Sequence, residues 1–351
     1  MSRTCHFFSD PSIYAGFRVK VVDIVMSMVS LNRETLPFRR DFYIAGTRCS
    51  LSTNSQTVLQ VASGWPQPPG QISQSVFEME VVVDATMDNT PDRPAHFRGM
   101  SHLVFAVLPP RSFVAFDLSR KRIHAVLSNT AASDSAFWKT LFLPVTIGVL
   151  GSNIGIVPLH CACLERNGSG FLVAGVSGTG KSTLATALAA QGYAFISDDW
   201  TYISKQKSTL MAHGLSTNIK LLPDAARFFP ELQEFTPHVS LNGEIAFEVD
   251  PARGMRFLVK DTSRPKHIFF LERNSASGCQ VVPCTSEHVR SYFERSSERL
   301  PNELAEARVF RSSVIRSLSN YPSWIVRTGE SPQKTAAAME KFLLEATHAA
   351  S

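Results

Sequence analysis

The sequence has few charged residues, and they are not gathered in long runs. Asp, Glu, Lys and Arg make up 19% of the 351 residues, whereas hydrophobic residues make up 44%. This balance favours a globular chain with a sizeable core over a disordered one. The formal net charge is +5, and no long basic run with interleaved aromatic residues occurs, so nucleic acid is not expected as a partner. The densest basic cluster, Arg120–Arg122, is expected in a solvated turn.

Long apolar runs are also lacking. No stretch approaches the roughly 18 apolar residues of a membrane span, so no membrane partner is expected. The amino-terminal apolar run is interrupted by Asp23 and has no small-residue cleavage site after it, so a signal peptide is not predicted and we expect a cytoplasmic protein. The six cysteines are scattered, and the spacing of Cys161 and Cys163 is not the C-x-x-C of redox or zinc sites. Buried free thiols are the expected state.

What the sequence does contain is a glycine-rich motif in a consistent setting. Residues 175–182 read GVSGTGKS, which matches the phosphate-binding pattern G-x-x-x-x-G-K-[ST]. The apolar run 171–174 before it is typical of a buried strand, and the helix formers of 182–190 follow it. Gly192 stands where a glycine commonly ends a helix. The context therefore predicts a strand, a phosphate loop and a helix.

The residue types of this motif fit nucleotide binding. Its glycines let the backbone turn its N–H groups toward phosphate oxygens, and the helix amino terminus adds partial positive charge. Lys181 is expected to reach the β- and γ-phosphates, and the Ser182 hydroxyl is the expected ligand of Mg²⁺. ATP and Mg²⁺ are the predicted cofactors. The residues predicted to bind the nucleotide are Gly175, Val176, Ser177, Gly178, Thr179, Gly180, Lys181, Ser182 and Thr183.

Two carboxylates follow the next predicted strand. Residues 193–196 read as a strand that leads to Asp198 and Asp199. At the carboxyl end of a strand beside a phosphate loop, one acid can hold Mg²⁺ and the other can accept a proton from an attacking hydroxyl. Two neighbouring acids also repel, which raises the pKa of one of them. A solvated turn is the alternative that these residues leave open.

A histidine precedes the motif on another predicted strand. Residues 157–164 are expected to form one strand that carries His160. Asn167-Gly168 is a strong hairpin signal and would join this strand to 171–174. The hairpin would bring His160 near the phosphate loop, although a strand histidine is more often structural.

These features together resemble the catalytic domain of bacterial HPr kinase/phosphorylase and its relatives. That family has a strand histidine, a hairpin, a P-loop, a helix ending in glycine and a strand ending in Asp-Asp. Here His160 precedes Lys181 by twenty-one residues, and Asp199 follows Lys181 by eighteen. The resemblance covers roughly 155–275. It implies an α/β fold with a P-loop kinase domain of the HPr kinase/PEP carboxykinase-like type.

The resemblance also implies roles for single residues. Lys181 would bind the nucleotide phosphates, while Ser182 and Asp198 would hold the metal. Asp199 would be the proton acceptor from the substrate serine, with His160 assisting. The segment 258–261, before a strand at 267–271, resembles the Val-Arg-Glu segment of the family, so Lys260 would replace a catalytic arginine and keep only its charge.

Other positions depart from the family pattern. Its further acidic metal ligand has no clear counterpart among Asn218, Lys220 and Asp224, which leaves a second metal open. Thr183 stands where a glutamate is often found. The divergent relatives include kinases of peptide-modification systems, such as those acting on lasso-peptide precursors, and this chain looks more like them than like the central-metabolism enzyme.

We expect three regions along the chain. Residues 1–35 form a leader or a poorly determined segment, 36–130 form a β-rich amino-terminal domain, and 131–351 form the P-loop domain. Strands are expected at 42–46, 58–61, 77–83 and 102–108, with a hairpin at 113–116 and 123–127. Docking of a substrate or leader peptide and a plain packing role are equally open for this β-rich domain.

Further elements are expected toward the carboxyl terminus. Ser133-Asp134 can cap a helix that runs toward Leu150 and is kinked or restarted at Pro144. This helix is expected to pack on the kinase sheet and to join the two halves of the chain. Residues 204–208 read as a polar connection. A basic segment with Arg253, Arg256 and Lys260 could face the transferred phosphoryl group or be a surface loop. Helices are expected at 225–229, 287–293, 304–318 and 334–346, and strands are expected at 245–249 and 324–326.

The predicted function is an ATP- and Mg²⁺-dependent kinase that transfers the γ-phosphoryl group to a serine hydroxyl. The acceptor would be a protein or peptide, with a ribosomally made precursor peptide as one candidate. A nucleotide-binding scaffold without transfer and a small-molecule kinase are the alternatives. The sequence leaves open whether the chain forms a homo-oligomer.

Overall fold

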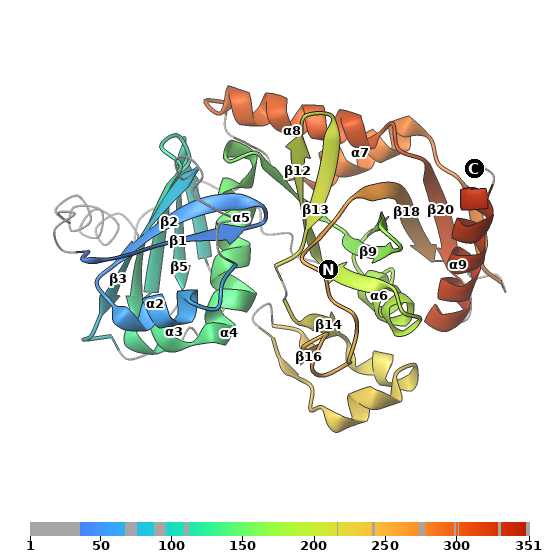
Figure 1. Ribbon diagram of the computed structural model, residues 1–351, viewed down its shortest axis with the longest axis horizontal. Coiled ribbons are helices and arrows are strands. Elements are labelled where there is room, and N and C mark those ends of the chain that lie inside the picture. The colour runs from blue at the N-terminus through green and yellow to red at the C-terminus, as the bar shows by residue number, and fades with distance from the viewer. Residues whose placement is uncertain are drawn as a thin grey trace. The chain divides into compact units, whose positions relative to one another are not determined.

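The computed structural model describes most of the chain (Figure 1). The described residues are 36–66, 76–87, 96–108, 112–215, 217–240, 243–273, 278–297, 300, 302–328 and 331–348. The predicted leader at 1–35 lies outside them. In this part of the chain, no helix has the length and apolarity that crossing a membrane requires.

Two compact units divide the chain. One comprises residues up to Ile154 together with 298–308, and the other comprises 155–297 together with 309–351. We predicted that the P-loop domain begins at residue 131, whereas residues 131–154 group with the first unit. Both units are of mixed α/β type, and each has its own core.

The first unit is built on a mixed sheet. Over the described residues, seven strands pair in the order β1-β2-β3-β7-β6-β5-β4. Their bounds are β1 Phe38–Ile44, β2 Thr47–Thr53, β3 Phe77–Asp84, β4 His96–Met100, β5 Leu103–Leu108, β6 Ser112–Asp117 and β7 Arg122–Ser128. β3 runs parallel to β2 and β7, and the other pairs are antiparallel. The predicted hairpin of β6 and β7 is confirmed.

A helix replaces one predicted strand in this unit. Residues 58–61, predicted as a strand, lie inside the helix α2, Gln56–Ala62, so that prediction was wrong. Val58 and Ala62 are one helical turn apart and both are buried. Because β2 and β3 are parallel, the chain needs a crossover between them, and α2 provides it.

The segment before the second unit is a chain of short helices. They are α3 Asn129–Ser133, α4 Ser135–Phe137, a π-helical turn at Trp138–Phe142, α5 Leu143–Leu150 and a 3₁₀ turn at Gly151–Asn153. The predicted cap is confirmed, because the Asp134 side chain accepts from the Ala136 amide at 2.8 Å. Pro144 lies in the first turn of α5, directly after the π-helical turn, where the regular i→i−4 hydrogen-bond ladder is already interrupted.

We expected this helical segment to pack on the kinase sheet, and it instead belongs to the first unit. Trp138 is fully buried there, with ring centroids 5.3 Å from Trp65 and 4.6 Å from Phe142. The aromatic face therefore contributes to the core of the β-rich unit.

The second unit contains the predicted P-loop. Among its described residues, six strands form a sheet in the order β11-β9-β10-β18-β20-β19. Their bounds are β9 Ala162–Arg166, β10 Ser169–Ala174, β11 Ala194–Ser197, β18 Pro265–Arg273, β19 Gln280–Pro283 and β20 Ser323–Thr328. β10, β18 and β20 are parallel. The β9–β10 hairpin turns at Asn167 and Gly168, both with positive φ, as predicted.

A second, antiparallel sheet has the order β17-β13-β12-β8 in the described chain. Its strands are β8 Ile156–His160, β12 Trp200–Gln206, β13 Thr209–His213 and β17 Thr262–Ser263. The single strand predicted at 157–164 was wrong. The extended strand is interrupted at Cys161, whose N–H donates to the Leu159 carbonyl at 2.9 Å. β8 and β9 therefore belong to different sheets. The polar connection predicted at 204–208 was also wrong, because the β12–β13 hairpin occupies it.

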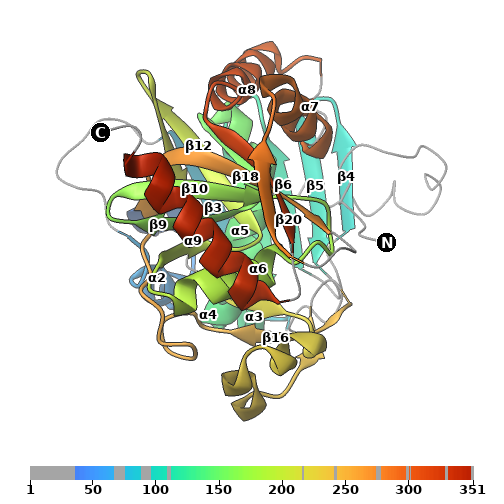
Figure 2. The same cartoon turned by 90° about the vertical axis from the view of Figure 1, so that its right-hand side faces the viewer.

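Helices cover both faces of the central sheet. α6 Lys181–Ala190 and α9 Pro332–His348 lie side by side over one face (Figure 2). The other face is packed by β8, β12 and β13, by α7 Ser286–Ser296, and by residues 309–318 of α8 Ala305–Leu318. β10 is therefore buried on both faces, as is typical of a parallel strand, and only its carboxyl end leads out to the loop.

A small antiparallel sheet completes this unit. It has the order β14-β16-β15 in the described residues, with bounds β14 Ile219–Leu221, β15 His238–Val239 and β16 Ile245–Val249. Two 3₁₀ turns, Pro223–Arg227 and Pro230–Glu234, connect β14 to β15. Buried residues of β14 and β16 share the core of α6, which places β14 beside the P-loop helix.

Candidate active site

The glycine-rich loop joins β10 to α6. Gly175 has φ +152°, and a Cβ atom there would lie 2.9 Å from the Leu271 carbonyl oxygen. Gly178 and Gly180 have φ of +81° and +96°, a region that residues with a side chain avoid. The glycines of the motif therefore meet a steric and a conformational requirement of the loop itself. Val176, Ser177 and Gly178 are exposed at its tip.

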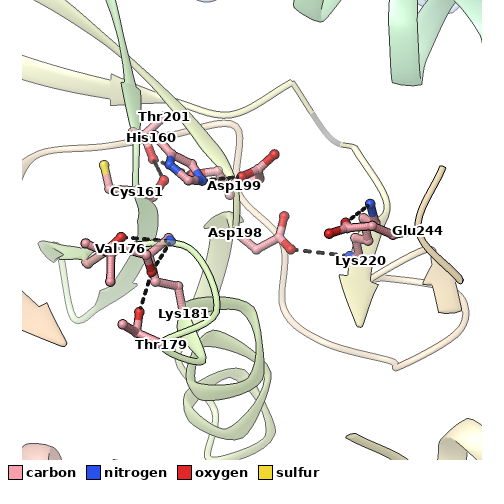
Figure 3. Close-up of polar contacts among 12 residues, drawn as sticks. His160, Cys161, Val176, Thr179, Lys181, Asp198, Asp199, Thr201, Lys220 and Glu244 are labelled. Atoms are coloured by element: carbon pink, nitrogen blue, oxygen red, sulfur yellow. Dashed lines mark hydrogen bonds and ion pairs between the residues drawn. The ribbon is translucent and has the colours of Figure 1, made fainter. Parts of the chain in front are cut away.

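Thr179 closes the loop on itself, because its hydroxyl and its amide both donate to the Val176 carbonyl, at 2.8 and 3.3 Å. Lys181 begins α6 and is buried, and its Nζ donates to the carbonyls of Gly175 at 2.9 Å and Val176 at 3.4 Å (Figure 3). Burial lowers the pKa of Lys181, although the charge of Asp199 opposes this. The Lys181 ammonium group is therefore held by the carbonyls of the loop that it follows.

Asp198 and Asp199 lie in the turn between β11 and β12, and their surroundings differ. Asp198 is buried, and its Oδ2 accepts from the Lys220 amide at 3.3 Å. The Ser182 hydroxyl of α6 also hydrogen-bonds to it. Burial, with the charge of Asp199, raises the pKa of Asp198 to about 7. The Asp198 carboxyl group therefore gains or loses its proton near neutral pH.

Asp199 is exposed, with 60% of its side chain accessible. Its Oδ1 lies 2.8 Å from His160 Nε2, in the same view as Asp198 (Figure 3). Desolvation favours a raised pKa, but the hydrogen bond and charge of His160, with the charge of Lys181, outweigh it and lower the pKa of Asp199. One acid of the pair is thus held ionised and open to solvent.

The register of the second sheet explains the His160–Asp199 contact. β8 ends at His160, which is paired with Trp200 at the start of β12. The centroids of the two rings lie 5.5 Å apart, so the imidazole packs beside Trp200 and next to the acid that precedes it. We predicted that the hairpin of β9 and β10 would bring His160 to the loop, and the pairing of β8 with β12 brings it to Asp199.

Lys220 lies on the far side of Asp198. Its amide bonds to that carboxylate, and its Nζ donates to Glu244 Oε2 at 2.8 Å (Figure 3). The charge of Lys220 also contributes to lowering the pKa of Asp199. In the sequence, Lys220 stood among the positions with no clear counterpart to the further acidic metal ligand, and Glu244 carried no signal.

Lys260 does not join these residues. Its side chain pairs with Glu165, and its amide donates to Phe195. Glu165 is opposite Gly170 in the β9–β10 hairpin, four residues before the strand ends at Ala174. At about 3.3 Å per residue this is roughly 13 Å along the strand from the loop. The structure therefore brings together Lys181, Ser182, Asp198, Asp199 and His160, and leaves Lys260 at the opposite end of the sheet.

The other members of the basic segment, Arg253 and Arg256, are exposed, as is Asp224, which pairs with Arg227. In the described residues, no group of three or more His, Cys, Asp and Glu side chains could hold a metal ion. Cys161 and Cys163 are free and buried, as expected. Burial raises the pKa of Cys161 to about 12 and that of Cys163 well above its usual range.

One comparison with known protein families falls on this region. The family described as "SynChlorMet cassette protein ScmC" matches residues 126–234, which include the P-loop and the acidic pair. No curated protein matches the chain. A solved structure, the Hpr(Ser) kinase/phosphatase from Coxiella burnetii, matches at 11% identity with a TM-score of 0.31. That match covers 54% of this chain and 99% of the other.

Proposed function

We propose that this chain is an ATP- and Mg²⁺-dependent kinase that transfers the γ-phosphoryl group to a serine hydroxyl of a protein or peptide. The observation that carries the proposal is the pairing of an ionised, exposed Asp199 with His160, next to a P-loop whose lysine is buried on loop carbonyls. Phosphoryl transfer needs little more than positioning and charge stabilisation, and this arrangement has groups for both.

Lys181 and the loop amides would bind the triphosphate. The ammonium is partly desolvated and bonds two neutral carbonyls, so an anionic phosphate is a better partner for it. The loop tip is exposed and accessible to a ligand. These features favour a nucleotide over an uncharged ligand.

Asp199 would activate the acceptor. Its carboxylate accepts the proton of the serine hydroxyl while the serine oxygen bonds to the γ-phosphorus and the bond to the ADP oxygen breaks. His160 holds the carboxylate in place through the 2.8 Å contact. Because Asp199 is exposed, the hydroxyl of a protein or peptide chain can reach it, whereas the buried Asp198 cannot be reached in this way.

Ser182 and Asp198 fit Mg²⁺. Both present oxygen atoms, they already contact each other, and a cation would replace the proton that the buried Asp198 holds near neutral pH. Bound Mg²⁺ would neutralise charge on the phosphates. Two protein oxygens are enough for Mg²⁺, because it usually keeps water and phosphate oxygens as its other ligands.

One observation favours the second candidate, a nucleotide-binding scaffold without transfer. Lys260, the cation that the resemblance assigned to catalysis, is bound to Glu165 away from the loop. The cations with the largest effect on the pKa of Asp199 are His160, Lys181 and Lys220. A protein that binds ATP and transfers phosphate to nothing would fit this alternative.

Asp199→Asn, compared with Lys181→Ala, tests the kinase proposal. We expect Asp199→Asn to lower transfer by about 10²- to 10⁴-fold, the usual contribution of a general base, and to leave nucleotide affinity within about threefold. Lys181→Ala should lose nucleotide affinity itself. Affinity is measured by titration with a fluorescent ATP analogue, and transfer with γ-labelled ATP and a library of serine peptides, with EDTA as control. Asp199→Asn with full transfer would contradict the role of Asp199 as the proton acceptor. Wild type that binds ATP and labels no peptide would contradict the kinase and favour the scaffold.

A further inference from the structure

The first glycine of the loop is held by a tyrosine distant in sequence. Tyr292 lies on α7, and its hydroxyl donates to the Gly175 carbonyl at 2.7 Å. The Tyr292 hydroxyl oxygen also accepts a hydrogen bond from the Gly175 amide at 3.0 Å. A single hydroxyl group therefore bonds both backbone groups of the residue at which β10 becomes the loop.

Packing fixes the tyrosine ring. Its centroid lies 5.1 Å from that of Phe270 on β18 and 5.4 Å from that of Phe293 on α7, both edge-to-face. Burial raises the pKa of Tyr292 to about 12, although the hydrogen bond to Gly175 opposes this. The hydroxyl is therefore protonated at neutral pH and remains a donor.

Gly175 also binds the lysine of the loop. Its carbonyl accepts from Lys181 Nζ at 2.9 Å as well as from Tyr292. When Lys181 turns to a phosphate, this carbonyl loses one of two donors. Gly175 is buried, and a buried carbonyl without a partner is unfavourable. The tyrosine hydroxyl is the donor that remains.

We infer that Tyr292 is a positioning residue for nucleotide binding. It keeps Gly175 bonded while Lys181 moves from the loop carbonyls to the phosphates, so the loop holds its conformation in both states. The inference rests on the nucleotide-binding part of the proposed function and does not depend on the acceptor. It links α7 to the P-loop through a contact that spans 117 residues.

Tyr292→Phe tests this inference, because it removes the hydroxyl and keeps the ring packing. In the free protein Lys181 still bonds the Gly175 carbonyl, whereas in the bound protein no side chain would. We therefore expect the Kd for a fluorescent ATP analogue to rise about tenfold, which corresponds to about 1.4 kcal/mol. The KM for ATP in the transfer assay should rise by a similar factor, with kcat changed less than twofold.

Tyr321→Phe is the matched control. Tyr321 packs against the same core cluster as Tyr292, and its hydroxyl bonds the Leu210 backbone instead of the loop. This variant should lose a comparable amount of stability and keep wild-type affinity. If Tyr292→Phe binds the analogue within twofold of wild type, or lowers kcat at unchanged KM, the tyrosine is only structural and the inference is overturned.

Two further results separate this inference from the kinase proposal. Wild type that binds ATP without transferring phosphate contradicts the kinase and leaves the tyrosine test intact, whereas wild type that binds no ATP overturns both. Should Tyr292→Phe fail to fold, hydrogen exchange on wild type decides. The Gly175 amide should stay protected when ATP is added, and a loss of its protection would overturn the inference.

Discussion

Neighbouring residues of this chain can have opposite chemistry when their surroundings differ. Asp198 is buried with its pKa raised to about 7, while Asp199, the next residue, is exposed with its pKa lowered. The sequence predicted that two adjacent acids would separate in pKa. It could not assign which one, because His160, Ser182 and Lys220 reach the pair from three other elements.

A single buried histidine outside the site gives a prediction about how stability depends on pH. His213 on β13 is buried, its Nε2 lies 2.8 Å from the Ser204 hydroxyl, and burial lowers its pKa to about 4. The unfolded chain, with a His pKa near 6.5, therefore binds the proton first as the pH falls. Stability is full above pH 6.5 and declines toward pH 4. When the pH is lowered from 7 to 5, His213 should decrease the free energy of unfolding by about 2 kcal/mol.

His213→Gln should reduce this acid sensitivity, because a glutamine amide can bond Ser204 without titrating. Urea unfolding at pH 7 and pH 5 measures the difference. His238→Gln is the control substitution, since it makes the same residue change at an exposed position. An unchanged response in His213→Gln would contradict the assignment of the acid sensitivity to burial of this ring.

Among the elements, those with strong local signals formed where the sequence predicted them. The β9–β10 hairpin follows from Asn167-Gly168, and α6 ends before Gly192, which has φ +89°. Residues 58–61 became a helix because the parallel strands on either side require a crossover. β8 and β9 separated at Cys161 because β8 pairs with β12, in which Trp200 lies opposite His160, 40 positions away, and no local pattern records that pairing. The turn signal at Asn167-Gly168 specifies only the pairing of β9 with β10.

Gly175, where β10 ends and the glycine-rich loop begins, allows a prediction about stability. Gly175→Ala should destabilise the second unit by about 1–3 kcal/mol, because its Cβ would meet the Leu271 carbonyl at 2.9 Å and the backbone would be strained. Gly192→Ala is the matched variant, with positive φ and open space around the added Cβ. It should lose less, about 1 kcal/mol, because only the positive φ opposes the added side chain. Denaturant unfolding compares the two, and equal losses would show that the close approach to Leu271 is relieved at no cost.

For the whole molecule, the division into two compact units has a measurable consequence. Each unit has its own core, with Trp138 in the first and the P-loop helix in the second. We expect two calorimetric unfolding transitions. An ATP concentration 100-fold above its Kd should stabilise the second unit alone by about 2.7 kcal/mol. Trp138→Leu should lower the other transition, because it removes a fully buried aromatic side chain.

A single transition that responds to both ATP and Trp138→Leu would contradict independent units. The order in which the two transitions occur does not matter for this test. What matters is that the ligand moves one and the substitution moves the other.

The sequence by itself determined the glycine-rich loop, its strand and helix, and the acidic pair that follows, because each depends on residues close together in the chain. Only the tertiary structure decided that His160 pairs with the exposed Asp199, that Lys260 pairs with Glu165, and that Tyr292 bonds to Gly175. Those contacts join residues 39, 95 and 117 positions apart. Their partners are set by strand register and helix packing, which depend on the whole core and not on any one segment.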